Sequence, residues 1–246
     1  TELLVVFGDT VKGDEVRRLV AFGDSLGIPV KNVALVDYSN SRGALDMGLA
    51  PELLPGYRPS NQPGMTIAEM LADPELDALW VVGANPLEHG PLASKKAFVV
   101  VQEMFLTETA RAARIVLPAS SAYEKDGTVT GVTGEVQRLQ KGLQAMGTKP
   151  DLEIVGLVAR ELGLAPMMGP WTPAAVFAEI RRDVPGYDLP WAAISAGGAA
   201  QTLPVNGHEL PARPDLVRSS RDGLFTSGTL GRYSKVLHSV LEGQPR

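Results

Sequence analysis

The sequence has no cysteine among its 246 residues. This absence excludes disulfide bonds, a thiolate nucleophile, cysteine-ligated zinc and any iron–sulfur cluster held by this polypeptide. Histidine is scarce too. His89, His208 and His238 lie far apart and form no His-x-x-x-His pair. We therefore expect no zinc site and assign no metal ligand.

Basic clusters and long hydrophobic runs are also missing. The 23 basic and 28 acidic residues give a net charge of −5, and no cluster of Lys and Arg exceeds a pair, so nucleic acid is not an expected partner. No apolar run reaches the roughly 18 residues that cross a bilayer. The chain starts at Thr1 with neither Met nor a signal-peptide pattern, which leads us to expect a fragment of a longer protein.

The composition, with 44% hydrophobic and 21% charged residues, is that of a typical globular protein. Short apolar runs rich in valine alternate with helix signals, at residues 3–7, 33–36, 79–82, 97–101 and 115–117. Such runs are typical of strands buried on both faces. The sequence therefore predicts an α/β fold: one Rossmann-like, mostly parallel sheet of five strands with flanking helices.

The helices are predicted by stripes and caps. These signals are an apolar stripe from Val16 to Gly23, a Thr66–Glu69 capping box, a Thr107 cap, a stripe from Leu152 to Leu162, and Thr172-Pro173. Residues 124–139 are turn-rich and suit an irregular hairpin or an extended loop. We expect a Rossmann-like core at residues 1–145, with a helical and irregular C-terminal segment, residues 146–246, packing on it.

The stretch from 186 to 222 shows no sustained period, apart from a tight hairpin expected at Asn206-Gly207. We predict an irregular wrapping segment here. Its large apolar residues Trp191, Ile194 and Leu203 either pack back on the core or anchor a neighbouring subunit.

One string looks catalytic. Residues 19–26 read Leu-Val-Ala-Phe-Gly-Asp-Ser-Leu, which resembles the nucleophile block of GDSL-type serine hydrolases, with Ser25 as nucleophile. That family supplies its base through an Asp-x-x-His, which none of the three histidines matches. The string also continues the helical stripe from Val16. We interpret residues 23–27 as the end of a helix and keep the hydrolase as a weaker alternative.

Four strings match another family in order. They are Asn40-Ser41-Arg42-Gly43-Ala44-Leu45-Asp46-Met47-Gly48, Val81-Val82-Gly83-Ala84-Asn85-Pro86, the twelve residues 99–110 (VVVQEMFLTETA), and Ile115-Val116-Leu117-Pro118-Ala119, followed by Glu124-Lys125-Asp126-Gly127-Thr128. The chain resembles the molybdopterin oxidoreductase superfamily over residues 3–162. The first string and Leu54-Pro55-Gly56-Tyr57-Arg58 are most similar to one branch, the large peripheral G-type subunit of bacterial NADH-quinone oxidoreductase, respiratory complex I.

In molybdenum members, matching loops hold the pterin dinucleotide, so the resemblance marks eight residues as remnants of a cofactor site: Gly83, Asn85, Gln102, Thr107, Glu108, Thr109, Gly127 and Thr128. The loops after residues 82 and 101 should meet at the carboxyl edge of the sheet, where ligands bind in such folds. Active members continue after Gly-Thr with an Asn and an Arg. Here Gly131 and Glu135 stand instead, and a buried carboxylate beside a pyrophosphate costs several kcal/mol.

The resemblance thus implies a structural, non-catalytic portion of the proton-translocating NADH-quinone oxidoreductase. No cofactor is expected in this segment. Iron–sulfur clusters belong to the upstream part of the intact polypeptide, the partners are other peripheral-arm subunits, and the location is the cytoplasmic side of the inner membrane, without a span. The alternative is the pterin-dinucleotide-binding part of a molybdenum or tungsten oxidoreductase such as a formate dehydrogenase.

Overall fold

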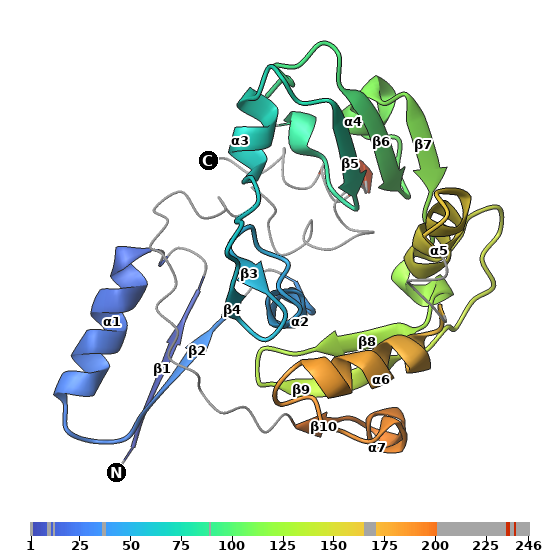
Figure 1. Ribbon diagram of the computed structural model, residues 1–246. Helices are drawn as coiled ribbons and strands as arrows, with labels where there is room; N and C mark the ends of the chain where they lie inside the picture. Colours follow the sequence, from blue (N-terminus) through green and yellow to red (C-terminus); the bar gives the residue numbers. More distant parts are fainter. Residues whose placement is uncertain are drawn as a thin grey trace.

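The computed structural model describes residues 2–8, 11, 13–35, 38–88, 90–164, 171–200, 235, 236 and 239. Within them the chain forms several small α/β units arranged around a central region (Figure 1). No helix among the described residues is both long and apolar enough to cross a bilayer. The hairpin expected at Asn206-Gly207 lies outside these residues.

The first unit is a parallel pair of strands with one helix. Strand β1 (Leu3–Phe7) pairs with β2 (Val30–Ala34), and α1 (Asp14–Ser25) connects them. Gly23 lets α1 approach β2, since a Cβ at this position would lie 3.0 Å from Val30 Cγ1. Leu4 and Val6 point away from α1 and are exposed. Within the described part of the chain, one face of this small sheet is therefore uncovered.

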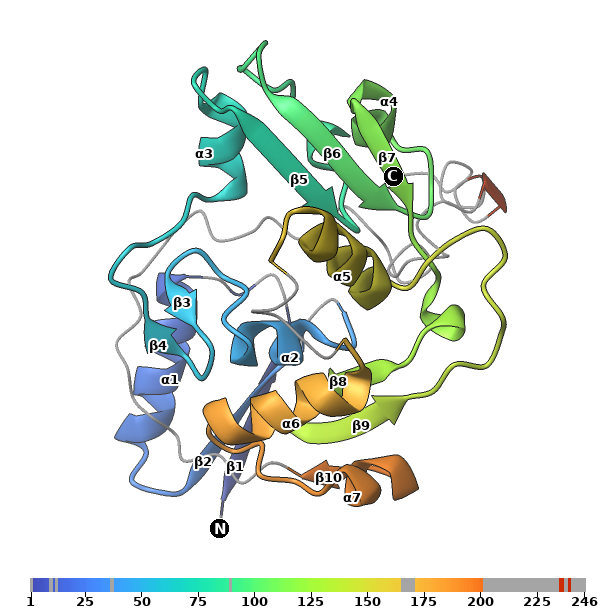
Figure 2. The same cartoon turned by 45° about the vertical axis from the view of Figure 1, so that its right-hand side comes forward.

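The second unit is a parallel sheet of three strands in the order β5 (Ala78–Val82), β6 (Phe98–Glu103) and β7 (Ile115–Pro118). Val81, Val99, Val101 and Ala110 form the buried cluster on one face, which α4 (Glu108–Ala112) covers. Trp80 and Phe98, on the other face, are exposed. Helix α5 (Asp151–Glu161) lies where the strands end, below their arrowheads in Figure 2.

The third unit is antiparallel. Strands β8 (Gly127–Thr130) and β9 (Glu135–Leu139) form a hairpin, and β10 (Ala199–Ala200) adds to β9. This confirms the hairpin, which is more regular than the sequence indicated. Helices α6 (Pro173–Asp183) and α7 (Trp191–Ala196) pack against it around a core cluster of Val136, Phe177, Val184, Tyr187 and Ile194.

Short elements lie between these units or, in the case of η1, between β5 and β6. They are α2 (Ser41–Asp46), the hairpin of β3 (Leu53–Leu54) and β4 (Arg58–Pro59), α3 (Ile67–Ala72), and the 3₁₀ turns η1 (Pro86–Glu88) and η2 (Ala122–Glu124). The capping box of α3 is present: Thr66 Oγ1 accepts from the Glu69 N–H, and the Glu69 carboxylate accepts from the Thr66 N–H. The caps at Thr107 and Thr172 are also present.

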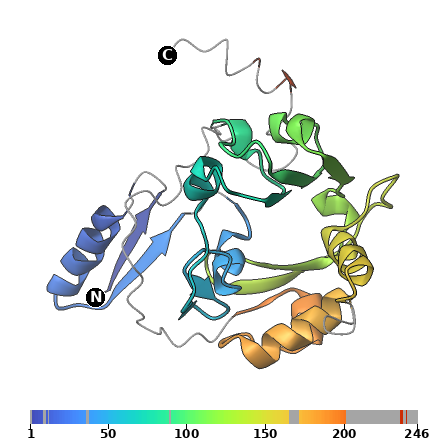
Figure 3. The same cartoon turned by 45° about the horizontal axis from the view of Figure 1, so that its top comes forward.

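The predicted α/β class, with parallel strands and flanking helices, is confirmed, but the grouping of all five strands in one sheet is wrong. Strands β1 and β2 form one sheet while β5, β6 and β7 form another. The connection through α2, β3, β4 and α3 separates them, and Figure 3 shows the first unit to one side of the others. Apolar runs indicate that strands are buried, but they do not specify which strands pair.

The segment after residue 186 also differs from the expected irregular chain, since residues 191–196 form α7. A helix of six residues is too short to show a period in the sequence. Trp191 and Ile194 pack back into the core cluster, with the Trp191 ring centroid 5.7 Å from that of Phe177. Of the two alternatives, packing on the core or anchoring a neighbouring subunit, these two side chains therefore take the first. Leu203 lies outside the described residues.

Candidate functional site

The loops after β5 and β6 meet at the carboxyl edge of the sheet, as predicted. The Gly83 N–H donates to the Gln102 carbonyl over 2.9 Å. Gly83 has a φ of 60°, a left-handed conformation that favours glycine, so the chain can turn back directly after β5. This turn brings Asn85 against the start of α4.

Asn85 is the hub of this edge and is 8% exposed. Its Oδ1 accepts from the Thr109 N–H (3.1 Å) and hydroxyl (2.8 Å), and its Nδ2 donates to the carboxylates of Glu108 (2.7 Å) and Glu88 (3.2 Å). An asparagine amide can make four hydrogen bonds, and all four are made within the chain. Asn85 therefore acts as a bracket between η1 and α4.

The charge of this edge is negative. Glu88 and Glu108 both bring carboxylate oxygens to the Asn85 amide, and the Arg111 guanidinium lies 3.9 Å from the Glu108 carboxylate. The hydrogen bond from Asn85 is the main cause that lowers the pKa of Glu108. Glu108 is thus held in its ionised form. Thr107, by contrast, only caps α4, accepting from the Ala110 N–H.

Gln102 faces a different set of partners. It is fully buried, and its Nε2 donates to Asp151 Oδ1 over 2.7 Å. The other Asp151 oxygen accepts from the ammonium of Lys125. In the described part of the chain, Gln102 Oε1 is buried with no hydrogen-bond partner. The strand end, α5 and the loop after η2 are thereby joined.

Gly127 and Thr128 are not brought to this edge. Both lie in β8, paired with Leu139 and Arg138 of β9. Figures 1 and 2 show that hairpin on the opposite side of α5 from the three-stranded sheet. Of the eight residues marked by the resemblance, Asn85, Glu108 and Thr109 are hydrogen-bonded together at this edge. Gly83 forms the turn before Asn85, and Thr107 caps the helix that carries Glu108 and Thr109.

Sequence reasoning missed a second polar cluster, built by the first matching string. Asp46 at the end of α2 is 1% exposed, and its Oδ2 accepts from the Tyr187 hydroxyl over 2.7 Å. The same hydroxyl lies 2.7 Å from Thr130 Oγ1. Tyr57, which has a left-handed φ of 59°, also hydrogen-bonds to Asp46. Four segments thus meet at one buried carboxylate.

This environment changes the pKa of the two phenols, Tyr57 and Tyr187. Burial is the main cause that raises the pKa of Tyr57 and of Tyr187, and their hydrogen bonds to Asp46 raise it further. Both therefore stay protonated as donors over the ordinary pH range. A strained backbone at Tyr57 costs about 1–2 kcal/mol, which this hydrogen bond helps to offset.

The first string also positions the β8–β9 turn. Asn40 Oδ1 accepts from the Thr130 N–H over 2.8 Å, and Arg42 Nη1 donates to the Val132 carbonyl over 2.9 Å. Gly134 packs against Arg42, because a Cβ there would lie 3.0 Å from Nη1. Glu135, expected as a buried carboxylate, is exposed. The cost assigned to its burial therefore does not apply.

Ser25 does not form a nucleophile elbow. It is the last residue of α1, and its hydroxyl donates to the Phe22 carbonyl over 2.7 Å. This confirms that residues 23–27 end a helix. The three histidines lie outside the described residues, so the absence of a zinc site stays a prediction.

The fold and the carboxyl edge of the three-stranded sheet together define a class of protein. It is an α/β protein in which a glycine turn (Gly83) and a helix cap (Thr107) follow parallel strands, at the edge where such sheets bind ligands. The chain belongs to the molybdopterin oxidoreductase family, whose family model matches residues 20–161.

The relatives include subunits of several oxidoreductases. The chain is 30% identical to the F420-dependent formate dehydrogenase 2 subunit alpha of Methanococcus maripaludis (87% of this chain, 35% of the relative). It is 31% identical to the second G-type subunit of NADH-quinone oxidoreductase from Rhizobium meliloti (85% of this chain, 29% of the relative). It is 26% identical to the NADPH-Fe(3+) oxidoreductase subunit alpha of Geobacter sulfurreducens (94% and 32%). The chain spans about a third of these relatives.

Proposed function

We propose that this chain is a structural, non-catalytic portion of a G-type subunit of NADH-quinone oxidoreductase. The likeness to the Rhizobium meliloti protein over 85% of the chain supports this branch. The similarity to formate dehydrogenase subunits is of the same degree. The choice between the two candidate functions therefore depends on the residues at the candidate site.

The single observation that carries the proposal is the closed hydrogen bonding of Asn85. All four of its amide hydrogen bonds go to Thr109, Glu108 and Glu88. A dinucleotide would bring phosphates, which need free N–H donors or cations. Two carboxylates stand beside that amide instead. The donor set at this edge does not fit a pterin dinucleotide.

The turn between β8 and β9 supports the same view. Active members of the family have an Asn and an Arg in this region, and this chain has Gly131 and Glu135. The guanidinium of Arg42 lies at this turn, but it is bonded to the Val132 carbonyl and packs on Gly134. We therefore assign no residue of this chain a catalytic role.

In this proposal the chain braces the part of the intact polypeptide that carries iron–sulfur clusters and passes electrons from NADH toward quinone. Its partners are other subunits of the peripheral arm, on the cytoplasmic side of the inner membrane. The chain itself holds no cofactor and acts through its surfaces.

One observation favours the second candidate, the pterin-binding part of a molybdenum or tungsten formate dehydrogenase. Gln102 Oε1 is a buried acceptor at the carboxyl edge with no partner among the described residues. A bound ligand with an N–H or O–H group would satisfy this atom.

Metal and pterin analysis of the intact protein tests the proposal. The full-length protein is purified anaerobically, its molybdenum and tungsten are measured by mass spectrometry, and released pterin is measured by fluorescence after denaturation. We expect neither metal in stoichiometric amount and no pterin. About one metal atom per chain, with pterin, would replace the first proposal by the second.

A further inference from the structure

The sheet of β5, β6 and β7 presents an apolar face to solvent within the described part of the chain. Side chains alternate between the two faces along a strand. Trp80 pairs with Val100, which in turn pairs with Ile115, so these three residues stand side by side across the sheet. Gln102 is the one polar residue of this face. We call it the Trp80 face, and its residues are Ala78, Trp80, Val82, Phe98, Val100, Gln102, Ile115 and Leu117.

The large side chains of the Trp80 face are partly open to solvent. The exposed fraction is 42–52% in Trp80, Val82, Phe98 and Ile115. Helix α5 meets the face at its carboxyl end, where Gln102 bonds to Asp151, and lies below the strand arrowheads in Figure 2. Parallel sheets occur almost only with both faces covered. The Trp80 face is therefore one side of a core whose other side is missing from the described residues.

The order of the strands explains why this face is bare. Both connections pack on the opposite face, where Leu92 from the β5–β6 connection and Ala110 of α4 contact the cluster around Val81 and Val99. Strands β5, β6 and β7 follow one another in one direction across the sheet, and right-handed crossovers then lie on the same side. A crossover in the reverse direction, to a strand beyond β5, would place its helix on the Trp80 face. Among the described residues, no strand pairs with that edge of β5.

The relatives supply the length of chain that such a cover needs. This chain spans 35%, 29% and 32% of the three relatives described above, so an intact polypeptide of similar length has about two thirds of its residues elsewhere. The Trp80 face carries no charged side chain and crosses all three strands. Such a face resembles a domain core that has been cut in half, which is typical of permanent contacts rather than transient ones. A permanent cover from the same polypeptide fits it best.

We propose that the Trp80 face packs against an amphipathic helix of the same intact polypeptide, from a part that lies outside these 246 residues. The apolar stripe of that helix covers Trp80, Phe98 and Ile115 and completes the second layer of the sheet. The inference goes beyond the proposed function and does not rest on it. The formate dehydrogenase relative and the G-type relative exceed this chain in length to a similar degree.

Hydroxyl-radical labelling of the purified full-length protein, without other subunits, tests whether the face is covered. Trp80 and Phe98 should be labelled at least about tenfold more slowly in the native protein than in the same protein unfolded in urea, because a covered side chain reacts only when its cover opens. An uncovered face, with these rings 42% and 46% exposed, would slow the labelling only about twofold. Tyr187, which is 2% exposed, is the protected control, and Tyr123, which is 61% exposed, is the open control.

Photocrosslinking identifies the cover. The photoreactive residue p-benzoylphenylalanine replaces Phe98 in the full-length protein, and equal amounts of ¹⁵N-labelled and unlabelled protein are mixed before irradiation. Mass spectrometry should find crosslinks within one polypeptide, to a segment outside residues 1–246 whose apolar residues recur at helical spacing. The matched control carries the same photoreactive residue at Tyr123, from which this segment should not be crosslinked.

Four results would overturn the proposal: only about twofold protection of Trp80 and Phe98, crosslinks that join labelled to unlabelled protein, crosslinks only to residues within 1–246, or a crosslinked segment without helical spacing. The labelling uses the unmodified protein, so its outcome does not depend on the folding of a variant. The metal and pterin measurement is independent of both experiments. A protein that contains molybdenum but protects Trp80 would refute the proposed function and leave this inference standing, and a metal-free protein with an open Trp80 face would do the reverse.

Discussion

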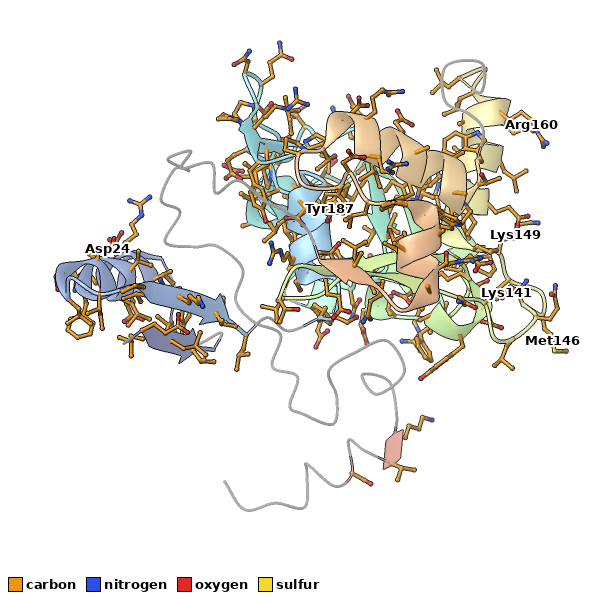
Figure 4. All side chains as sticks on the ribbon, turned by 90° about the horizontal axis from the view of Figure 1, so that it is seen from below. Asp24, Lys141, Met146, Lys149, Arg160 and Tyr187 are labelled. Carbon is orange, nitrogen blue, oxygen red and sulfur yellow. The ribbon has the colours of Figure 1, made fainter. Side chains whose placement is uncertain are left out.

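Removing the Tyr187 hydroxyl should destabilise the protein far more than the loss of one oxygen atom suggests. The residue is 2% exposed, and its hydroxyl lies 2.7 Å from both Asp46 Oδ2 and Thr130 Oγ1. In Tyr187→Phe the buried Asp46 carboxylate loses a donor that water cannot replace. Figure 4 shows Tyr187 in the body of the molecule rather than at its rim.

The magnitude follows from the charge of the acceptor. A hydrogen bond to an ionised group contributes about 1.5–3 kcal/mol, against about 1 kcal/mol for a neutral pair. We expect Tyr187→Phe to lower the free energy of unfolding by about 2–3 kcal/mol. Asp46→Ala should cost about 3–5 kcal/mol, because it leaves the hydroxyls of the half-buried Tyr57 and the buried Tyr187 without their shared acceptor.

Urea unfolding at pH 7, followed by far-ultraviolet circular dichroism, measures these values. The matched control is Tyr123→Phe, which removes the same atom from a side chain that is 61% exposed. The control should change the free energy by less than about 0.5 kcal/mol. The double variant of Asp46 and Tyr187 should lose less than the sum of the two single variants, since the residues share one interaction.

Two outcomes would refute this reasoning. One is a Tyr187→Phe variant within about 0.5 kcal/mol of the wild type at an unchanged denaturant slope, which would mean that the buried carboxylate is solvated by other means. The other is strict additivity in the double variant, which would mean that the energy lost in Tyr187→Phe comes from the contact of the hydroxyl with Thr130 and not from its bond to Asp46.

Three further predictions concern pH, charge and packing. Folding raises the pKa of Tyr57 and of Tyr187, so the free energy of unfolding should fall above about pH 10, by up to about 1.4 kcal/mol per pH unit for each phenol. Urea unfolding measured from about pH 8.5 to 11 checks this. The decrease of the free energy of unfolding with pH should be smaller in the variant in which both tyrosines are Phe. Asn85→Asp should lower the free energy of unfolding by about 2–4 kcal/mol at pH 7, because it sets a third carboxylate beside Glu88 and Glu108. This loss of stability should shrink below about pH 5, where the carboxylates become protonated. A loss of stability that does not depend on pH would contradict the prediction. Gly156→Ala should lower the melting temperature, although Ala favours helices, because its Cβ would displace Trp171; a higher melting temperature would show that the indole moves freely.

The elements that the sequence predicts well are those set by local chemistry. The stripe from Val16 gives α1, the Thr66–Glu69 box gives α3, and the glycine after β5 turns the chain toward Asn85. Each depends on residues a few positions apart. The carboxyl edge could be predicted for the same reason, since parallel neighbouring strands bring their following loops together.

The features that the sequence does not predict depend on distant partners. Nothing in the sequence near Asp46 indicates Tyr187 as its donor, and a carboxylate at the end of a short helix would ordinarily be expected in solvent. The separation of the five strands into two sheets has the same origin, because pairing is decided by tertiary packing. The resemblance marks Gln102 as a site residue, but no local signal indicates its partner Asp151.

The tie between Asp46 and Tyr187 also bears on how the chain is made. The two residues are 141 positions apart, so a ribosome adding about 5–20 residues per second synthesises the acceptor roughly 7–30 s before its donor. Throughout that interval Asp46 at the end of α2 has no Tyr187 to cover it, and its carboxylate stays hydrated while the β8–β9 hairpin forms. We expect the nascent chain to remain accessible to chaperones and proteases until residue 187 has left the exit tunnel, and this part of the fold to close in one late step.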